Sequence, residues 1–277
     1  MKKFLYVSFL AWILSTGIQA EEKKPVTEES NSTTLSVKET KEVNVVTRRD
    51  IKILEATENI RLLTQQIAKE YLFLFKTPQQ ALIKNKLNKL LVKLSNDLRV
   101  ISETTKDKDS KDILEFLAYS KDQISQTLTE KLDNEQAALM LDYSETLLEG
   151  ADSIAAAHTY DFSKEERMLM RAKQTEYLIE RIMKYYMALH VGFDNPTNRD
   201  QMTEAIADLK ENLEKIDAYV YPEKIALVKD ETVKGWSVIE NTLAKSKTLF
   251  IPKLMLISTA YLEEKIEVIA LHHSQNQ

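Results

Sequence analysis

Residues 59–75 of the chain read NIRLLTQQIAKEYLFLF, and this stretch decides the fold. Its apolar side chains recur every three to four positions, which places them on one face of an α-helix. A shift of 115 residues leads to 174–190, QTEYLIERIMKYYMALH, which repeats the pattern. The matched pairs are Leu63/Leu178, Ile67/Ile182, Lys69/Lys184, Tyr71/Tyr186 and Leu74/Leu189.

The same shift of 115 holds along the rest of the chain. The tripeptide LML at 139–141 returns at 254–256. Chance alignments of apolar stripes need a new offset for each helix, whereas a duplication keeps one offset throughout, so we predict an internal duplication. Further pairs in this register are Leu87/Met202, Leu91/Ile206, Leu94/Leu209, Leu98/Leu213, Ile101/Ile216, Ile124/Ile239, Leu128/Leu243, Leu147/Leu262, Ile154/Ile269 and His158/His273.

Breaks between the apolar stripes predict eight helices. Ser163 followed by Glu166 forms a capping box that opens the fifth helix. Short connections make neighbouring helices antiparallel, so we expect an all-α fold of two tandem up-down four-helix bundles, 47–160 and 161–277. A single eight-helix bundle is the alternative, and the two bundles either stack end to end or pack side by side. The breaks lie at TPQQ (77–80), ETTKDKDSKD (103–112), DNPTN (194–198), YPEK (221–224) and FIPK (250–253).

Composition agrees with long helices. The chain of 277 residues is 43% hydrophobic and 29% charged, with only 4 Gly and 5 Pro, so a turn-rich β fold is disfavoured. The net charge is −5 and the two signs are interspersed, which argues against a nucleic-acid partner. Because the chain has no Cys, stability comes from packing alone.

The first twenty residues have the layout of a secretory signal peptide. Lys2 and Lys3 precede an apolar core, and Ala20 precedes an acidic stretch, so we expect cleavage after Ala20 and a periplasmic location. Residues 21–46 are rich in Glu, Lys, Ser and Thr without an aromatic residue, which predicts a disordered linker. No later segment is apolar over the ~20 residues that a spanning helix needs, so we expect no transmembrane segment in the mature chain.

The first long helix carries a resemblance to a known family. Its core, LTQQIAKEYL (63–72), resembles the pattern GRQRMLSQRIAKxYL of the periplasmic sensor domain of the type IV pilus chemoreceptor PilJ and of nitrate-responsive histidine kinases. Residues 174–193 look like a more diverged copy, and Trp236 in TVKGWSVIENTL also fits. The resemblance spans 47–275 as two tandem modules. It implies a ligand-sensing bundle in which two first helices face each other across a dimer and an arginine from each binds an anion such as nitrate.

Carried onto this chain, the motif arginine falls on Arg61, and the second copy has Glu176 in its place. If the modules pair internally as a pseudo-dimer, one Arg and one Glu share the pocket, which suits an amine-bearing or zwitterionic ligand better than a small oxyanion. The alternative is that both side chains lie on solvated faces or form a modest ion pair. The ligand-binding residues expected from the resemblance are Arg61, Thr64, Gln65, Glu176 and Glu180.

No motif of an enzyme is present, so we expect no catalytic residues and no cofactor. We also expect no metal site, because His272 and His273 are adjacent and point about 100° apart on a helix. Two functions remain. One is an exported PilJ-like sensor that binds a small molecule between helices and signals through a separate membrane partner. The other is a ligand-free scaffold of an envelope or type IV pilus system, and the chain is either a monomer with an internal pseudo-dimer or a homodimer.

Overall fold

The computed structural model describes residues 48–77, 80–245 and 250–277, all within one unit of the chain, 44–277. The predicted signal peptide and linker lie outside these residues. The described part contains eight α-helices and no strand, which confirms the all-α prediction. The helices are α1 (Arg48–Phe73), α2 (Gln80–Thr104), α3 (Lys108–Thr127), α4 (Asn134–His158), α5 (Lys164–His190), α6 (Pro196–Asp217), α7 (Glu223–Leu243) and α8 (Pro252–Gln275), with a 3₁₀ turn η1 (Leu74–Lys76) after α1.

Local sequence sets the helix ends. The capping box predicted at Ser163 is confirmed, because its hydroxyl accepts from the Glu166 amide while the Glu166 carboxylate accepts from the Ser163 amide. The carboxylates of Asp107 and Asp133 cap α3 and α4 by accepting from the amides of Ser110 and Gln136, and Pro196 occupies the first turn of α6. The capping side chains of Ser163, Asp107 and Asp133 satisfy amide groups that a helix cannot pair internally.

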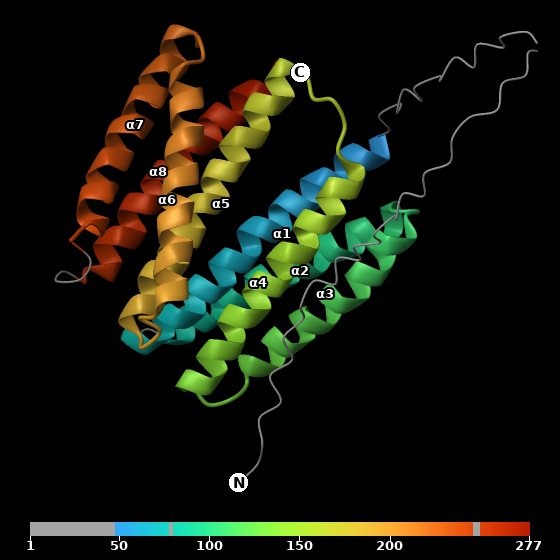
Figure 1. Ribbon diagram of the computed structural model, residues 1–277, viewed down its shortest axis with the longest axis vertical. Coiled ribbons are helices and arrows are strands. Elements are labelled where there is room, and N and C mark those ends of the chain that lie inside the picture. The colour runs from blue at the N-terminus through green and yellow to red at the C-terminus, as the bar shows by residue number, and fades with distance from the viewer. Residues whose placement is uncertain (1–47, 78–79, 246–249) are drawn as a thin grey trace, which may run out of the picture. The chain divides into compact units, whose positions relative to one another are not determined.

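The helices form two sets with the same neighbours. In the first half, α1–α4, the contacts α1–α2, α2–α3, α3–α4 and α1–α4 close a ring. In the second half, α5–α8, the contacts α5–α6, α6–α7, α7–α8 and α5–α8 do the same. The halves meet where α1 packs on α5, and Figure 1 shows this pair lying between the other helices of each half.

Positions 115 residues apart have matching surroundings in most cases. Shifted by 115, every helix boundary of the first half falls within three residues of its counterpart in the second half. Leu94 and Leu209 are both fully buried, and so are Ile154 and Ile269. An exception is Leu87, which is buried while its counterpart Met202 is half-buried. The two halves therefore share their helix boundaries and most of their buried positions. That they arose by duplication stays a prediction.

A histidine joins the last helix to the first in each half, and His273 is buried whereas His158 is half-buried. His158 Nδ1 lies 3.1 Å from Asp50 Oδ1, and its Nε2 lies 3.3 Å from Thr105 Oγ1. His273 Nδ1 lies 2.6 Å from Glu165 Oε2, and its Nε2 lies 3.0 Å from the hydroxyl of Tyr221. The histidines are 115 positions apart, and so are the two carboxylates. Each histidine therefore fixes the closing contact of its ring.

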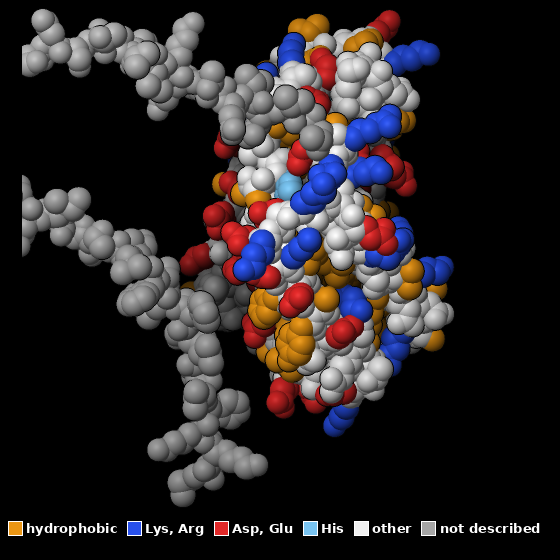
Figure 2. All heavy atoms as spheres, turned by 90° about the vertical axis from the view of Figure 1, so that its right-hand side faces the viewer, with side chains coloured by type: hydrophobic (Ala, Val, Ile, Leu, Met, Phe, Trp, Pro, Cys, Tyr) orange, Lys and Arg blue, Asp and Glu red, His pale blue; other side chains and the backbone are white. Residues whose placement is uncertain are grey.

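Charged side chains of both signs are mixed over the face that Figure 2 shows, with hydrophobic side chains between them. Large apolar side chains on the outer surface include Phe116 and Tyr119 of α3, which are 58% and 57% exposed. Over the described ranges, no helix is long and apolar enough to cross a membrane.

Candidate functional site

The contact between α1 and α5 is polar although it is buried. Gln66 donates to Glu180 across it at 3.1 Å, and Lys69 Nζ lies 2.5 Å from the other oxygen of Glu180. Leu54 and Glu58 near the start of α1 line one pocket with Leu169 and Lys173 near the start of α5, and these pairs are 115 positions apart. The two helices therefore run parallel and nearly in register. The sequence left open whether the modules pair within one chain, and the structure pairs α1 with α5 within it.

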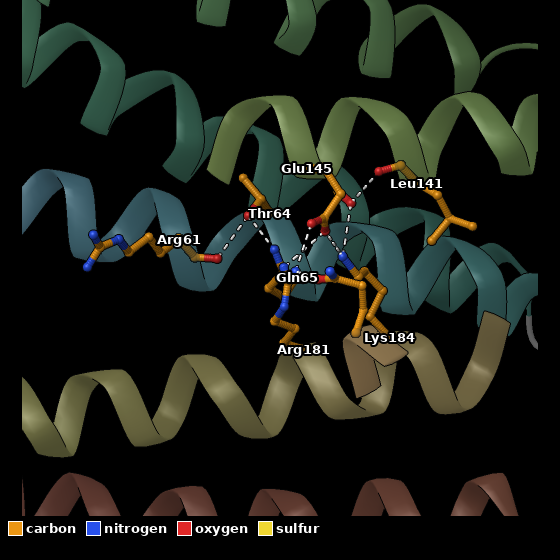
Figure 3. A network of polar contacts seen from close by, with 9 residues as sticks. Arg61, Thr64, Gln65, Leu141, Glu145, Arg181 and Lys184 are labelled. Atoms are coloured by element: carbon orange, nitrogen blue, oxygen red, sulfur yellow. Dashed lines mark hydrogen bonds and ion pairs between the residues drawn. The ribbon is translucent and has the colours of Figure 1, made fainter. Parts of the chain in front are cut away.

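Arg181 and Lys184 of α5 reach across to Glu145 of α4, as Figure 3 shows. Arg181 donates to both carboxylate oxygens, at 3.1 and 2.9 Å, and the fully buried Lys184 pairs with one of them. Burial lowers the pKa of Lys184 to about 8, although the Glu145 charge acts in the opposite direction. Burial also opposes the charge of Glu145, but the two cations outweigh it and lower its pKa.

Lys69 of α1 makes the reciprocal contact to the second half. Burial opposes its charge, but Glu180, Glu70 and Glu263 outweigh burial and raise its pKa. Glu263 of α8 lies beside Glu180, and burial together with that neighbouring charge raises the pKa of Glu263 to about 9. Burial and the Glu180 charge thus favour the protonated form of Glu263, whereas the nearby Lys69 favours its charged form.

Arg61 lines a pocket that spans both halves. Its Nε lies 2.5 Å from Asp152 of α4, and its Nη1 pairs with Glu58 one turn earlier on α1. The pocket, here the Arg61 pocket, has a volume of about 360 Å³. Its charged lining residues are Arg61, Asp152, Arg171, Asp208 and Glu211.

The other four expected ligand residues do not line the Arg61 pocket. Glu176 is buried and pairs with Lys173 at 3.0 Å, so the structure does not bring it together with Arg61 in one pocket. Thr64 and Gln65 are fully buried, and Gln65 donates to the Thr64 hydroxyl at 3.2 Å (Figure 3). Glu180 belongs to the polar layer with Lys69. The part of these residues in ligand binding stays a prediction.

Sequence reasoning missed Glu145, Arg171 and Glu263. Each contacts a partner on another helix, across the two halves for Glu145 and Arg171 and within the second half for Glu263. Their charged side chains look in the sequence like any others on a solvated helix face, so no local signal marks them.

Within the described residues, no group of three or more His, Cys, Asp or Glu side chains is placed to hold a metal ion. No family model, curated protein or solved structure matches this chain. The resemblance to PilJ-type sensor domains therefore stays an expectation from residues 63–72.

Proposed function

We propose that the protein is an exported PilJ-like sensor that binds a small zwitterion in the Arg61 pocket and signals through a separate membrane partner. The proposal includes the origin of the chain by duplication of one four-helix unit, whose copies pair as a pseudo-dimer. The observation that carries it is the Arg61 pocket, which gathers two guanidinium groups and three carboxylates from four helices.

The charges of the pocket suit a molecule that carries both signs. A guanidinium offers planar paired donors to a ligand carboxylate. The Arg171 guanidinium donates a 3.2 Å hydrogen bond to Asn212 and forms no ion pair within 4 Å among the described residues. Asp208 and Glu211 supply acceptors for a ligand ammonium, and Glu211 also pairs with Lys215. A simple anion such as nitrate would meet these carboxylates as like charges, so the pocket favours an amino acid or a similar zwitterion.

The position of the pocket supports a sensing role. Arg61 and Asp152 belong to α1 and α4 of the first half, whereas Arg171 and Asp208 belong to α5 and α6 of the second. A ligand that contacts both halves binds better to one arrangement of them than to another, and it shifts their equilibrium by that difference in affinity.

The test is a thermal-shift screen with nitrate, nitrite, succinate, glycine, glutamate and lysine, followed by calorimetry. A binder gains stability as RT ln(1 + [L]/Kd). We expect at least one amino acid to raise the melting temperature, and Arg171→Gln to weaken its binding about tenfold, as expected for the loss of about 1.4 kcal/mol. Arg99→Gln is the matched control, because Arg99 is an exposed residue of α2 that pairs with Glu103 on its own helix. If wild type and Arg171→Gln bind the amino acid with equal affinity, the proposal is wrong.

The scaffold function is the second candidate, and the exposed apolar pair on α3 favours it. Phe116 and Tyr119 are three positions apart, so they share a helix face. Exposed aromatic side chains are typical of protein interfaces. A screen in which none of the probes shifts the melting temperature would favour this candidate.

A further inference from the structure

A second and larger pocket lies between α1, α5 and α8. Its volume is about 540 Å³, within the range of small-molecule sites. We call it the α8 pocket. Much of its lining is apolar and comes from all three helices, including Ile51, Leu54, Leu169, Met170, Val268 and Leu271.

The charges in the α8 pocket are mostly negative. Five glutamates line it together with one cation, Lys173, whose charge is already matched by Glu176 at 3.0 Å. Among the described residues, Glu55, Glu264 and Glu267 are exposed and make no ion pair. The pocket therefore favours a positive ligand over a negative one.

Glu58 is the buried member of this set. Its residue exposure is 6%, one carboxylate oxygen pairs with Arg61, and the other, Oε2, has no hydrogen-bond partner within the described structure. A buried acceptor without a partner costs free energy. A donor bound in the pocket beside Glu58 would supply that partner.

Three of the five lining carboxylates lie toward one end of the α8 pocket, whereas Glu55 and Glu166 lie among the apolar side chains nearer the other end. On α1, Glu58 follows Ile51 and Leu54 in the chain. Helix α8 runs antiparallel to α5 and α1, because its C-terminal His273 contacts Glu165 at the start of α5. Glu264 and Glu267 precede Leu271 on α8, so they lie toward the same end of the pocket as Glu58.

We propose that the α8 pocket binds a small amphiphilic amine, with its ammonium group among Glu58, Glu264 and Glu267 and its hydrocarbon body against Ile51, Leu54 and Leu271. The α8 pocket shares no lining residue with the Arg61 pocket, although Glu58 pairs with Arg61, and the proposal does not depend on the zwitterion proposed there. The ammonium donates hydrogen bonds to carboxylates in a partly dry site, where such contacts are stronger than in water. The hydrocarbon body removes apolar lining from water.

The experiment is calorimetry on the mature chain with n-octylammonium, n-octanol and octanoate below their aggregation concentrations. We expect octylammonium to bind at least tenfold more tightly than octanol, and octanoate to bind more weakly than either. Glu267→Gln and Glu264→Gln should each weaken octylammonium about threefold to tenfold and leave octanol unchanged. Leu271→Lys should weaken all three probes or abolish their binding.

Controls use matched exposed residues elsewhere. Glu115→Gln on α3 and Leu82→Lys on α2 should leave octylammonium affinity unchanged. Arg171→Gln should also leave it unchanged, so failure of the zwitterion site and failure of the amine site are distinguishable. Equal affinity for octanol and octylammonium, or full octylammonium affinity in both Glu264→Gln and Glu267→Gln, would overturn the proposal.

Discussion

The two halves of the molecule have the same arrangement of four helices, but they differ in the polar residues where the halves meet. Buried Lys69 and Lys184 occupy equivalent positions on α1 and α5, and each pairs with a carboxylate of the other half. The carboxylates are not equivalent: Glu180 is on α5, whereas Glu145 is on α4. At the positions of Glu180 and Arg181, the first half has the neutral Gln65 and Gln66.

This difference shows what joining two halves in one chain allows. In a symmetric dimer, a residue near the twofold axis faces its own copy, so equal charges would lie close together. Here Glu180 instead faces Gln66 and Lys69. Unlike residues at equivalent positions therefore give the buried Lys69 a partner of opposite charge.

The largest effect is expected at Glu145. Glu145→Gln leaves Arg181 and Lys184 without their shared carboxylate, and removing one partner of a buried pair costs about 3 kcal/mol of unfolding free energy. At about 2–4 °C per kcal/mol, the melting temperature falls by about 6–12 °C. Glu180→Gln should cost less, about 1 kcal/mol, because Glu70 and Glu263 remain near Lys69.

Urea denaturation measures both free energies. Adding Lys184→Met to Glu145→Gln should recover part of the loss, because it removes a buried charge that has no partner. If Glu145→Gln and Glu180→Gln cost the same, the two lysine sites are energetically equivalent and the comparison fails.

The second prediction compares the loss of stability when His273 or His158 is replaced. The His273 side chain is fully buried, with contacts to Glu165 and Tyr221, whereas His158 is 9% exposed. We expect His273→Ala to lower the free energy of unfolding by about 3 kcal/mol and His158→Ala by about 1.5 kcal/mol, the range for hydrogen bonds to charged groups. Urea denaturation at pH 7 is the measurement, and a larger loss in His158→Ala would reverse the ranking.

The smallest effect depends on pH and concerns Glu263, where the first half has Leu148. Between the ordinary glutamate pKa of 4.5 and the raised value of about 9, the folded protein binds more protons at this site than the unfolded chain does. Stability contributed by this group therefore falls as pH rises through that window. Glu263→Gln keeps a neutral side chain and should raise the melting temperature by about 3 °C at pH 8, with no gain at pH 4.

Melting curves of wild type, Glu263→Gln and the exposed-site control Glu115→Gln at pH 4 and pH 8 measure this. A gain in Glu263→Gln of the same size at both pH values would mean that titration of Glu263 is not the cause.

The sequence predicted the helices well because the signals are local. The capping box of Ser163 and Glu166 involves residues within one turn, and it is present as expected. Arg61 does line a pocket, whereas its expected partner Glu176 pairs with Lys173. The offset of 115 residues identifies which positions in the two halves are equivalent. It does not predict which partners their side chains contact when the two halves pack together.

By itself, the sequence determined the all-α class, the helix ends and the register of equivalent buried positions. These follow from apolar periodicity and capping, which depend on residues close together in the chain. Only the tertiary structure decided that α1 packs on α5 within the chain, and that Glu145 pairs with Lys184. Such contacts depend on the packing angle and separation of distant helices, and a charged residue on a polar face has the same sequence pattern whether it meets water or another helix.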